Sequence, residues 1–308
     1  MNKKYRFLIV FSLIFIVLFG SQYTSDMTLE ELKDRYTNDQ SQFIEIMGMP
    51  VHFRKEGSGP ALVLIHGTAS SLHTWDDWTE DLKDHFEVIR MDIPAFGLTG
   101  PHPESDYSMD TYVQFLHQFL QSQSIDSCYI AGNSLGGAIA WNYTIKHPNE
   151  VKKLILLDAS GAPKNTPPPL IFRLANLPVL SHALKYITPR SIIEKNLKDV
   201  YFNDDKVTDE LIDRYYHLAR RTGNRQAFID RARLKFELPT EQLKEISCPT
   251  LIQWGADDQW IPVADVEFFI NQIESSQSII YPDAGHVPME EIPAQSANDA
   301  KHFLMKSY

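Results

Sequence analysis

The sequence predicts an α/β protein in which a mostly parallel, twisted sheet is flanked by helices and carries a helical insertion. Continuous apolar runs at 61–65, 128–131 and 153–157 are typical of strands buried on both faces. Helical stretches alternate with these runs, which argues for parallel rather than antiparallel pairing. The stretch 162–245 opens with several prolines and then shows helical periodicity with no clear strand, which predicts the insertion.

Length and composition narrow the class of protein. The 308 residues fit one large domain, or one domain with an inserted subdomain, and 43% hydrophobic residues suffice for a sizeable core. A net charge of −11 argues against nucleic-acid binding, which needs a basic surface. The two cysteines, Cys128 and Cys248, lie in or beside predicted interior strands and are interpreted as buried apolar residues. No group of histidines or cysteines has zinc-ligand spacing, so no metal is expected.

The N-terminus is either a secretory signal or a membrane anchor. Three basic residues within the first six precede the apolar stretch 7–19. Small residues suitable for cleavage are not evident where Leu18 and Phe19 stand, which favours an uncleaved anchor over 1–25. Its basic end would be cytoplasmic and the rest of the protein would lie outside that membrane. Cleavage would instead give a secreted or periplasmic protein. A polar helix or linker is expected over 26–40.

The strongest chemical signal is the stretch Gly-Asn-Ser-Leu-Gly-Gly at 132–137. It stands between a predicted strand and a predicted helix, so Ser134 lies on a sharp turn that only small neighbours accommodate. Such a turn lifts the serine hydroxyl above the sheet edge at the positive end of a helix. Ser134 is therefore the candidate nucleophile, and the backbone N–H of Leu135 is a candidate donor to an oxyanion.

A second candidate donor follows the apolar run 61–65. The chain continues there as His66-Gly67-Thr68, and a loop that leaves a central strand can aim the N–H of Thr68 at the nucleophile. His66 has two interpretations: a residue that shapes this loop, which we favour, or a catalytic base. Asp92, at the start of the turn-rich segment 92–100, is expected to fix that segment by local hydrogen bonds, with a catalytic role as the alternative.

The remaining elements of the first half follow from periodicity and turn residues. The segments 42–47 and 51–54 alternate apolar and polar residues around Gly48, which predicts a hairpin. Helices are predicted over 71–83 and 108–123, and a strand over 86–91.

Taken in order, His66-Gly67, the segment 92–100 and the turn 132–137 resemble the α/β-hydrolase fold superfamily. The resemblance covers residues 41–161 and 246–306, and the core domain is assigned to 41–161 and 246–308. It implies a catalytic triad in the chain order nucleophile, acid, histidine. It also implies that the insertion 162–245 is a helical cap over the active site, where crevices at strand C-termini bind ligands.

Four helices are predicted in the cap, over 170–177, 190–196, 209–221 and 225–236. Arginines are frequent in its second half. They are interpreted as a solvated, salt-bridged helical face rather than an anion site. The arginines concerned are Arg220, Arg221, Arg225, Arg231 and Arg233.

The acid and the base of the triad come from the last part of the core. After the strand at 249–255, the family pattern Trp-Gly-x-x-Asp places the acid at Asp258, in preference to its neighbour Asp257. A last strand at 278–281 precedes a loop with His286, which is the expected base. A closing helix is predicted over 288–303.

These residues predict a serine hydrolase that uses no cofactor and cleaves a small or medium carboxylic ester by way of an acyl-enzyme. Haloalkane dehalogenases and epoxide hydrolases resemble this fold but use a carboxylate nucleophile, so Ser134 argues against both classes. The turn around Ser134 also resembles that of the meta-cleavage product hydrolases, which cut carbon–carbon bonds. Those enzymes have a tryptophan after the histidine, whereas Val287 and Pro288 follow His286 here. A C–C bond hydrolase and a catalytically silent binding protein remain the alternatives.

Overall fold

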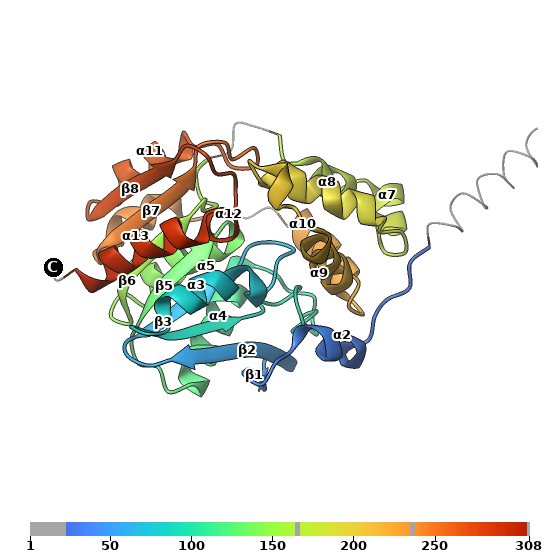
Figure 1. Ribbon diagram of the computed structural model, residues 1–308, viewed down its shortest axis with the longest axis horizontal. Coiled ribbons are helices and arrows are strands. Elements are labelled where there is room, and N and C mark those ends of the chain that lie inside the picture. Colours follow the sequence, from blue (N-terminus) through green and yellow to red (C-terminus); the bar gives the residue numbers. More distant parts are fainter. Residues whose placement is uncertain (1–22, 164–166, 235–237, 307–308) are drawn as a thin grey trace, which may run out of the picture.

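The computed structural model describes residues 23–163, 167–234 and 238–306. Its centre is an eight-stranded sheet with the order β1-β2-β4-β3-β5-β6-β7-β8. β1 pairs with β2 and β2 with β4 in antiparallel fashion, and every other pair is parallel. The predicted fold class, a mostly parallel sheet between helices, is confirmed (Figure 1).

The strands fall close to the predicted apolar runs. Their bounds are β1 Ser41–Ile46, β2 Met49–Gly57, β3 Ala61–Ile65, β4 Glu87–Met91, β5 Cys128–Asn133, β6 Val151–Leu157, β7 Thr250–Gly255 and β8 Ser276–Tyr281. The predicted hairpin is the antiparallel pair β1 and β2, which turns at Met47 and Gly48, both with positive φ. The central strands are buried on both faces because helices cover each side.

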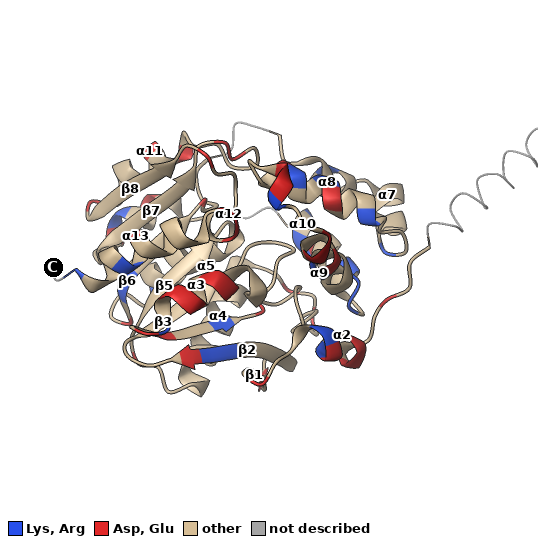
Figure 2. Cartoon of the chain, in the orientation of Figure 1, with Lys and Arg blue, Asp and Glu red and all other residues tan. Residues whose placement is uncertain are grey.

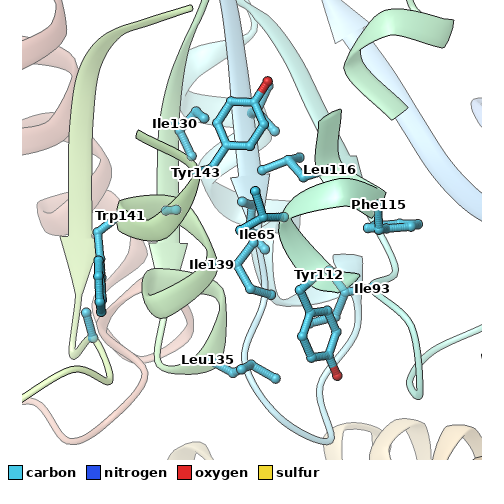
Figure 3. Packing of buried hydrophobic residues seen from close by; sticks show 14 of the residues in the cluster. Ile65, Ile93, Tyr112, Phe115, Leu116, Ile130, Leu135, Ile139, Trp141 and Tyr143 are labelled. Atoms are coloured by element: carbon cyan, nitrogen blue, oxygen red, sulfur yellow. The ribbon is translucent and has the colours of Figure 1, made fainter. Parts of the chain in front are cut away.

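Helices of the core cover the two faces of the sheet. α4 Met109–Ser122, α5 Leu135–Lys146 and α11 Asp265–Gln272 pack on one face, where the largest apolar cluster forms (Figure 3). The short 3₁₀ turn Leu72–Trp75, α3 Asp76–Leu82 and α13 Pro293–Met305 cover the other face. Alternate residues of β3 point into the two clusters, Val63 and Ile65 into the first and Leu62 and Leu64 into the second.

Two predicted helices are divided in the structure. The stretch predicted as one helix over 71–83 begins as the 3₁₀ turn and continues as α3. The closing helix predicted over 288–303 is divided into α12 Pro288–Glu291 and α13, because Pro293 lacks the backbone N–H that would continue the first helix.

In its described residues, the cap contains five α-helices inserted between β6 and β7, beside the core (Figure 1). They are α6 Leu170–Ala175, α7 Pro178–Leu184, α8 Arg190–Val200, α9 Asp209–Ala219 and α10 Asn224–Arg233. The sequence prediction of a helix over 170–177 ends before α7, which it missed. Proline occupies the first position of α7, where a missing N–H has no cost.

The interpretation of the cap arginines as a solvated, salt-bridged face is wrong in its solvation for two of the five, Arg221 and Arg225. Arg221 and Arg225 are buried, with 7% and 8% of their surface exposed. The Arg225 guanidinium donates to Asp26 Oδ1 and Thr24 O at 2.6 and 2.9 Å, and Arg221 packs against Gly100. These side chains hold the chain before α2 Leu29–Tyr36 and the core against the cap, so they act as structural cations.

Most of the expected membrane anchor, residues 1–22, lies outside the described residues. Within the described part, no helix is both long and apolar enough to cross a membrane. Residues 26–40 contain α2, which begins with the Thr28–Glu31 capping box and packs against α9.

Candidate active site

Five loops meet at the carboxyl edge of the parallel strands. β3 leads to Thr68, β5 to Ser134, β6 to Asp158, β7 to Asp258 and β8 to His286. Because parallel strands all end at one edge, residues distant in sequence are brought together there. This edge holds all of the predicted site residues.

Ser134 occupies the strained turn that the sequence predicts. Its backbone has φ 54° and ψ −115°, an uncommon conformation for a residue with a side chain. The flanking glycines leave the space for it: a Cβ on Gly132 would lie 2.3 Å from Gly136 O, and one on Gly136 2.1 Å from Ile65 O. The turn is held by the Ser134 N–H, which donates to Leu157 O at 3.0 Å. The result is a half-buried hydroxyl at the start of α5.

His286 and Asp258 form a short, buried pair. The His286 Nδ1 lies 2.7 Å from Asp258 Oδ2, and the other oxygen of Asp258 accepts the N–H groups of Trp260 and Ile261 at 2.7 and 2.9 Å. Because an ionised carboxylate only accepts, Nδ1 carries the proton and a neutral ring has its lone pair on Nε2. The neighbouring Asp257 is exposed, so of the two aspartates only Asp258 contacts the histidine.

Ser134 and His286 line the same cavity. A further contact links their loops, because the Asn133 amide donates to His286 O at 2.9 Å. No hydrogen bond joins the Ser134 hydroxyl to the His286 ring among the described side chains. Contacts of this kind commonly tighten only when a substrate is bound.

The predicted oxyanion donors lie at the ends of two neighbouring strands. Leu135 is the first residue of α5, and its N–H therefore has no partner within the helix. Thr68 lies in the 67–70 turn, closed by the Ser70 N–H donating to Gly67 O at 3.3 Å, and lines the cavity with Ser134. A Cβ on Gly67 would lie 3.1 Å from Ser134 Cβ, so glycine lets this turn approach the nucleophile closely.

His66 and Asp92 belong to a separate, enclosed network. The His66 Nδ1 donates to Gly67 O at 2.8 Å and its Nε2 accepts the Ile93 N–H at 3.1 Å. Both ring nitrogens are therefore used by the backbone, and burial lowers the pKa of His66. Asp92 accepts the N–H groups of Leu72 and Leu98, each at 2.7 Å. These contacts fix the loops after β3 and β4.

Sequence reasoning missed one residue of this edge, Asp158. It follows β6, is fully buried and has φ 44°. One carboxyl oxygen accepts the Gly255 N–H at 3.0 Å, and one lies within 4.8 Å of a carboxyl oxygen of Asp258 and a nitrogen of His286. Burial raises the pKa of Asp158 well above its usual value, and the charge of Asp258 raises it further. A polar residue at the end of a buried parallel strand is the signal that could have indicated it.

The cavity over Ser134 is apolar and lies between core and cap. Its empty volume is about 1250 Å³, including space open to solvent. The cap supplies most of the apolar walls and the core supplies the polar floor. The apolar residues include Ile171, Phe172, Leu184, Ile187, Ile193, Leu197, Phe228 and Trp260. Such a lining suits an apolar group attached to a reactive polar centre.

Away from this edge, His117, His147 and Glu150 approach one another closely enough to be considered as metal ligands. Their polar atoms are already engaged. His147 Nδ1 lies 3.1 Å from Glu150 Oε1, His117 Nδ1 lies 3.2 Å from the Tyr143 hydroxyl, and the two imidazoles stack. Glu150 lies at the amino end of β6, whereas the candidate site lies at the carboxyl ends of the strands, so this cluster forms no part of the site.

Comparison with known families agrees with this architecture. The family model described as the alpha/beta hydrolase fold matches residues 60–293, about three quarters of the sequence. The chain belongs to the α/β-hydrolase family. The relatives whose names state an activity are hydrolases or lipases, which supports a hydrolase function for this chain.

Two curated relatives of this α/β hydrolase have different named activities. It is 26% identical over 276 residues to the 2-hydroxy-6-oxo-6-(2'-aminophenyl)hexa-2,4-dienoic acid hydrolase of Metapseudomonas resinovorans, covering 86% of this chain and 91% of the relative. It is 30% identical over 261 residues to Lipase 3 of Moraxella sp. strain TA144, covering 80% and 78%. Among solved structures, a putative lipase of Acinetobacter baumannii AYE aligns with a TM-score of 0.75 at 25% identity, covering 90% and 94%.

In this α/β hydrolase the loop of the histidine is bonded to the cap. The His286 N–H donates to Val200 O at 2.7 Å. Glu291, which is 1% exposed, accepts the N–H groups of Gly285 and Asn203, both at 2.7 Å. One buried carboxylate thus joins the end of α8 to the histidine loop, so the position of the cap and the position of His286 are coupled.

Proposed function

We propose that the protein is a serine hydrolase that cleaves a carboxylic ester with an apolar acyl group. The observation that carries the proposal is the short Asp258–His286 hydrogen bond beside a strained serine in an apolar cavity. The roles are Ser134 as nucleophile, His286 as base and Asp258 as the acid that orients it.

The reaction follows from these positions. His286 Nε2 accepts the Ser134 proton while Oγ attacks the ester carbonyl, and Asp258 stabilises the imidazolium. The N–H groups of Thr68 and Leu135 stabilise the oxyanion, and one such donor lowers the barrier by about 3–4 kcal/mol. The imidazolium then protonates the leaving alcohol. Water attacks the acyl-enzyme with the same histidine as base, releasing the acid and restoring Ser134.

The cavity favours a small or medium acyl chain. Its walls are mostly aliphatic and aromatic. Arg225, the one Lys or Arg that lines it among the described residues, is already bonded to Asp26 and Thr24. An apolar chain gains about 0.8 kcal/mol for each methylene it buries. We expect activity to rise with acyl length until the cavity is filled.

The second candidate is hydrolysis of a carbon–carbon bond in a dienoate ketone. The similarity to a dienoic acid hydrolase over most of both chains favours it. Two features favour ester hydrolysis over carbon–carbon bond hydrolysis. The cavity offers no uncommitted cation for a substrate carboxylate among the described residues, and Val287 follows His286 where the C–C hydrolases have tryptophan.

The test uses labelling and a substrate panel. A fluorophosphonate should label the wild type and the Ser70→Ala variant, a matched serine in the same cavity, but not Ser134→Ala. Activity on p-nitrophenyl esters of increasing chain length should exceed activity on a vinylogous dienoate ketone. The reverse order would assign the C–C reaction. Absence of labelling in the wild type would indicate a silent binding protein.

For location, we propose that residues 1–25 anchor the protein in a membrane with the catalytic part outside the cytoplasm. The support is the apolar stretch 7–19 after three basic residues. A secreted form would follow from cleavage. Fractionation with and without carbonate washing separates the two, since an anchored chain stays with the membrane.

A further inference from the structure

The outer side of α6 and α7 exposes more large apolar side chains than any other part of the described cap. Val179 is 81% exposed, and its neighbours in this helix pair and the chain beside it are 43–61% exposed. We call this set the outer cap patch. It consists of Tyr23, Leu177, Val179, Leu180 and Tyr186. Contiguous exposed apolar surface marks an interaction site, since leaving it in water is unfavourable.

The same helix pair is also apolar on its inner side. Ile171 and Phe172 of α6, with Leu184 and Ile187 at the end of α7, line the cavity over Ser134. A surface helix normally presents one apolar face inwards and one polar face to water. α6 and α7 therefore form a thin wall with apolar groups towards the substrate cavity and apolar groups towards the outside.

The charge around the patch differs from that of the whole chain. The net charge is −11, yet no Asp or Glu occurs between Asp158 and Glu194. Arg173 and Lys185 flank the patch, and neither has an ion-pair partner in the described part of the chain. α7 itself carries no acidic residue (Figure 2). Apolar residues flanked by two cations that have no ion-pair partner in the described part of the chain suit an anionic lipid surface.

The N-terminal chain is fastened to this same surface. The Thr24 N–H donates to Tyr186 O at 2.9 Å, and Tyr23 forms an antiparallel β-bridge with Ile187. The guanidinium of the buried Arg225 donates to Thr24 O at 2.9 Å. The described chain thus begins beside α7, at the opposite end of the molecule from the C-terminus (Figure 1). Tyr23 is four residues past Phe19, the last residue of the apolar stretch. The apolar stretch is therefore adjacent in sequence to a residue of the outer cap patch.

We propose that the outer cap patch rests on an anionic lipid bilayer, with Val179 and Leu180 inserted among the acyl chains and Arg173 and Lys185 at the head groups. Apolar substrates would then enter the cavity from the membrane across the α6–α7 wall. That delivery role rests on the proposed esterase function, whereas the lipid contact does not.

The contact is tested with a fluorophore that reports its surroundings. Full-length protein with Val179→Cys, in a Cys248→Ala background, is labelled with an NBD probe and placed in vesicles of equimolar phosphatidylcholine and phosphatidylglycerol. Ile280→Cys is the matched control, since Ile280 is 48% exposed on β8. We expect the Val179 probe to shift to the blue and to be quenched by spin-labelled lipid, and the Ile280 probe to do neither.

Two results would overturn the proposal. Equal quenching at both positions would show that the patch has no preferred contact with lipid. A blue shift of the Val179 probe in detergent without vesicles, growing with protein concentration, would assign the patch to contact between two copies of the chain instead.

Activity gives an independent readout. The charge reversal Arg173→Glu with Lys185→Glu should lower hydrolysis of a vesicle-borne ester by about fivefold for each charge. Hydrolysis of a water-soluble butyrate ester should be unchanged. The exposed pair Lys152→Glu with Lys244→Glu is the control and should alter neither rate. Equal loss from both pairs would contradict the patch. Absence of esterase activity in every variant would refute the proposed function but leave the quenching test to decide the lipid contact.

Discussion

Two buried aspartate–histidine hydrogen bonds lie in this molecule and differ in what surrounds them. Asp92 Oδ2 lies 2.8 Å from His52 Nδ1, and Asp258 Oδ2 lies 2.7 Å from His286 Nδ1. In each pair the aspartate also accepts two backbone N–H groups. By distance and by hydrogen bonding to the acid, the two pairs are almost the same.

The difference is the second nitrogen of each ring. His52 Nε2 lies 3.0 Å from the Ser41 hydroxyl, and His52 and Asp92 are fully buried. His286 instead lines the cavity that also holds Ser134. An imidazole can move a proton only where its free nitrogen meets a reacting group. A short carboxylate–imidazole contact therefore does not identify a catalytic pair by itself.

The largest expected effect comes from Asp258→Asn. With its amide oxygen on the Trp260 and Ile261 N–H groups, its NH₂ would face His286 Nδ1 and favour the wrong tautomer. We expect kcat to fall by about 10⁴-fold while the urea unfolding midpoint changes little. If Asp258→Asn instead lost stability with kcat unchanged, the Asp258–His286 pair would be structural, like the Asp92–His52 pair.

Asp92→Asn should do the opposite. The amide nitrogen would oppose one of the N–H donors, Leu72 or Leu98, and leave it unpaired in the core. We expect the free energy of unfolding to fall by about 3 kcal/mol, measured by urea denaturation, with kcat of the remaining folded enzyme within a few-fold. A loss of kcat comparable to that of Asp258→Asn would place Asp92 in the reaction.

Lowering the pH should destabilise the folded protein through the enclosed histidines around Asp92. Burial lowers the pKa of His66, and lowers that of His73 to about 3. Both rings stay neutral when folded but bind a proton in the unfolded chain below about pH 6.5. The contribution of His73 to stability is therefore complete above that pH and declines as the pH falls towards 3, by about 1.4 kcal/mol per pH unit, and the contribution of His66 changes in the same direction. Urea midpoints measured from pH 7 to 4 test this, and His73→Gln should flatten the curve.

The smallest effect is expected at Asp158, beside the second pair. Because its pKa is raised, folding takes up a proton, and the wild type loses this contribution as the pH rises above about 4. Asp158→Asn mimics the neutral form and needs no proton. Its stability relative to the wild type should grow with pH, by at most about 1.4 kcal/mol per unit, with kcat reduced far less than by Asp258→Asn. A difference independent of pH would show that Asp158 is ionised in the folded protein.

The sequence by itself determined the sheet, the order of its elements and the glycine-flanked turn at Ser134. These follow from local causes: apolar runs make buried strands, and only small residues fit beside a strained serine. It also predicted Thr68, Leu135, Asp258 and His286, through motifs at the ends of strands. The structure places all of them at one edge of the sheet, and their roles in catalysis stay predictions.

Only the tertiary structure decided what depends on neighbours distant in the chain. It buried Arg221 and Arg225, which helical periodicity had predicted to be solvated, because the chain before α2 crosses the cap there. It also placed Asp158 beside Asp258, a contact between residues 100 positions apart in sequence. Burial, pairing and the direction in which a ring nitrogen faces are set by packing, and packing is a property of the whole chain.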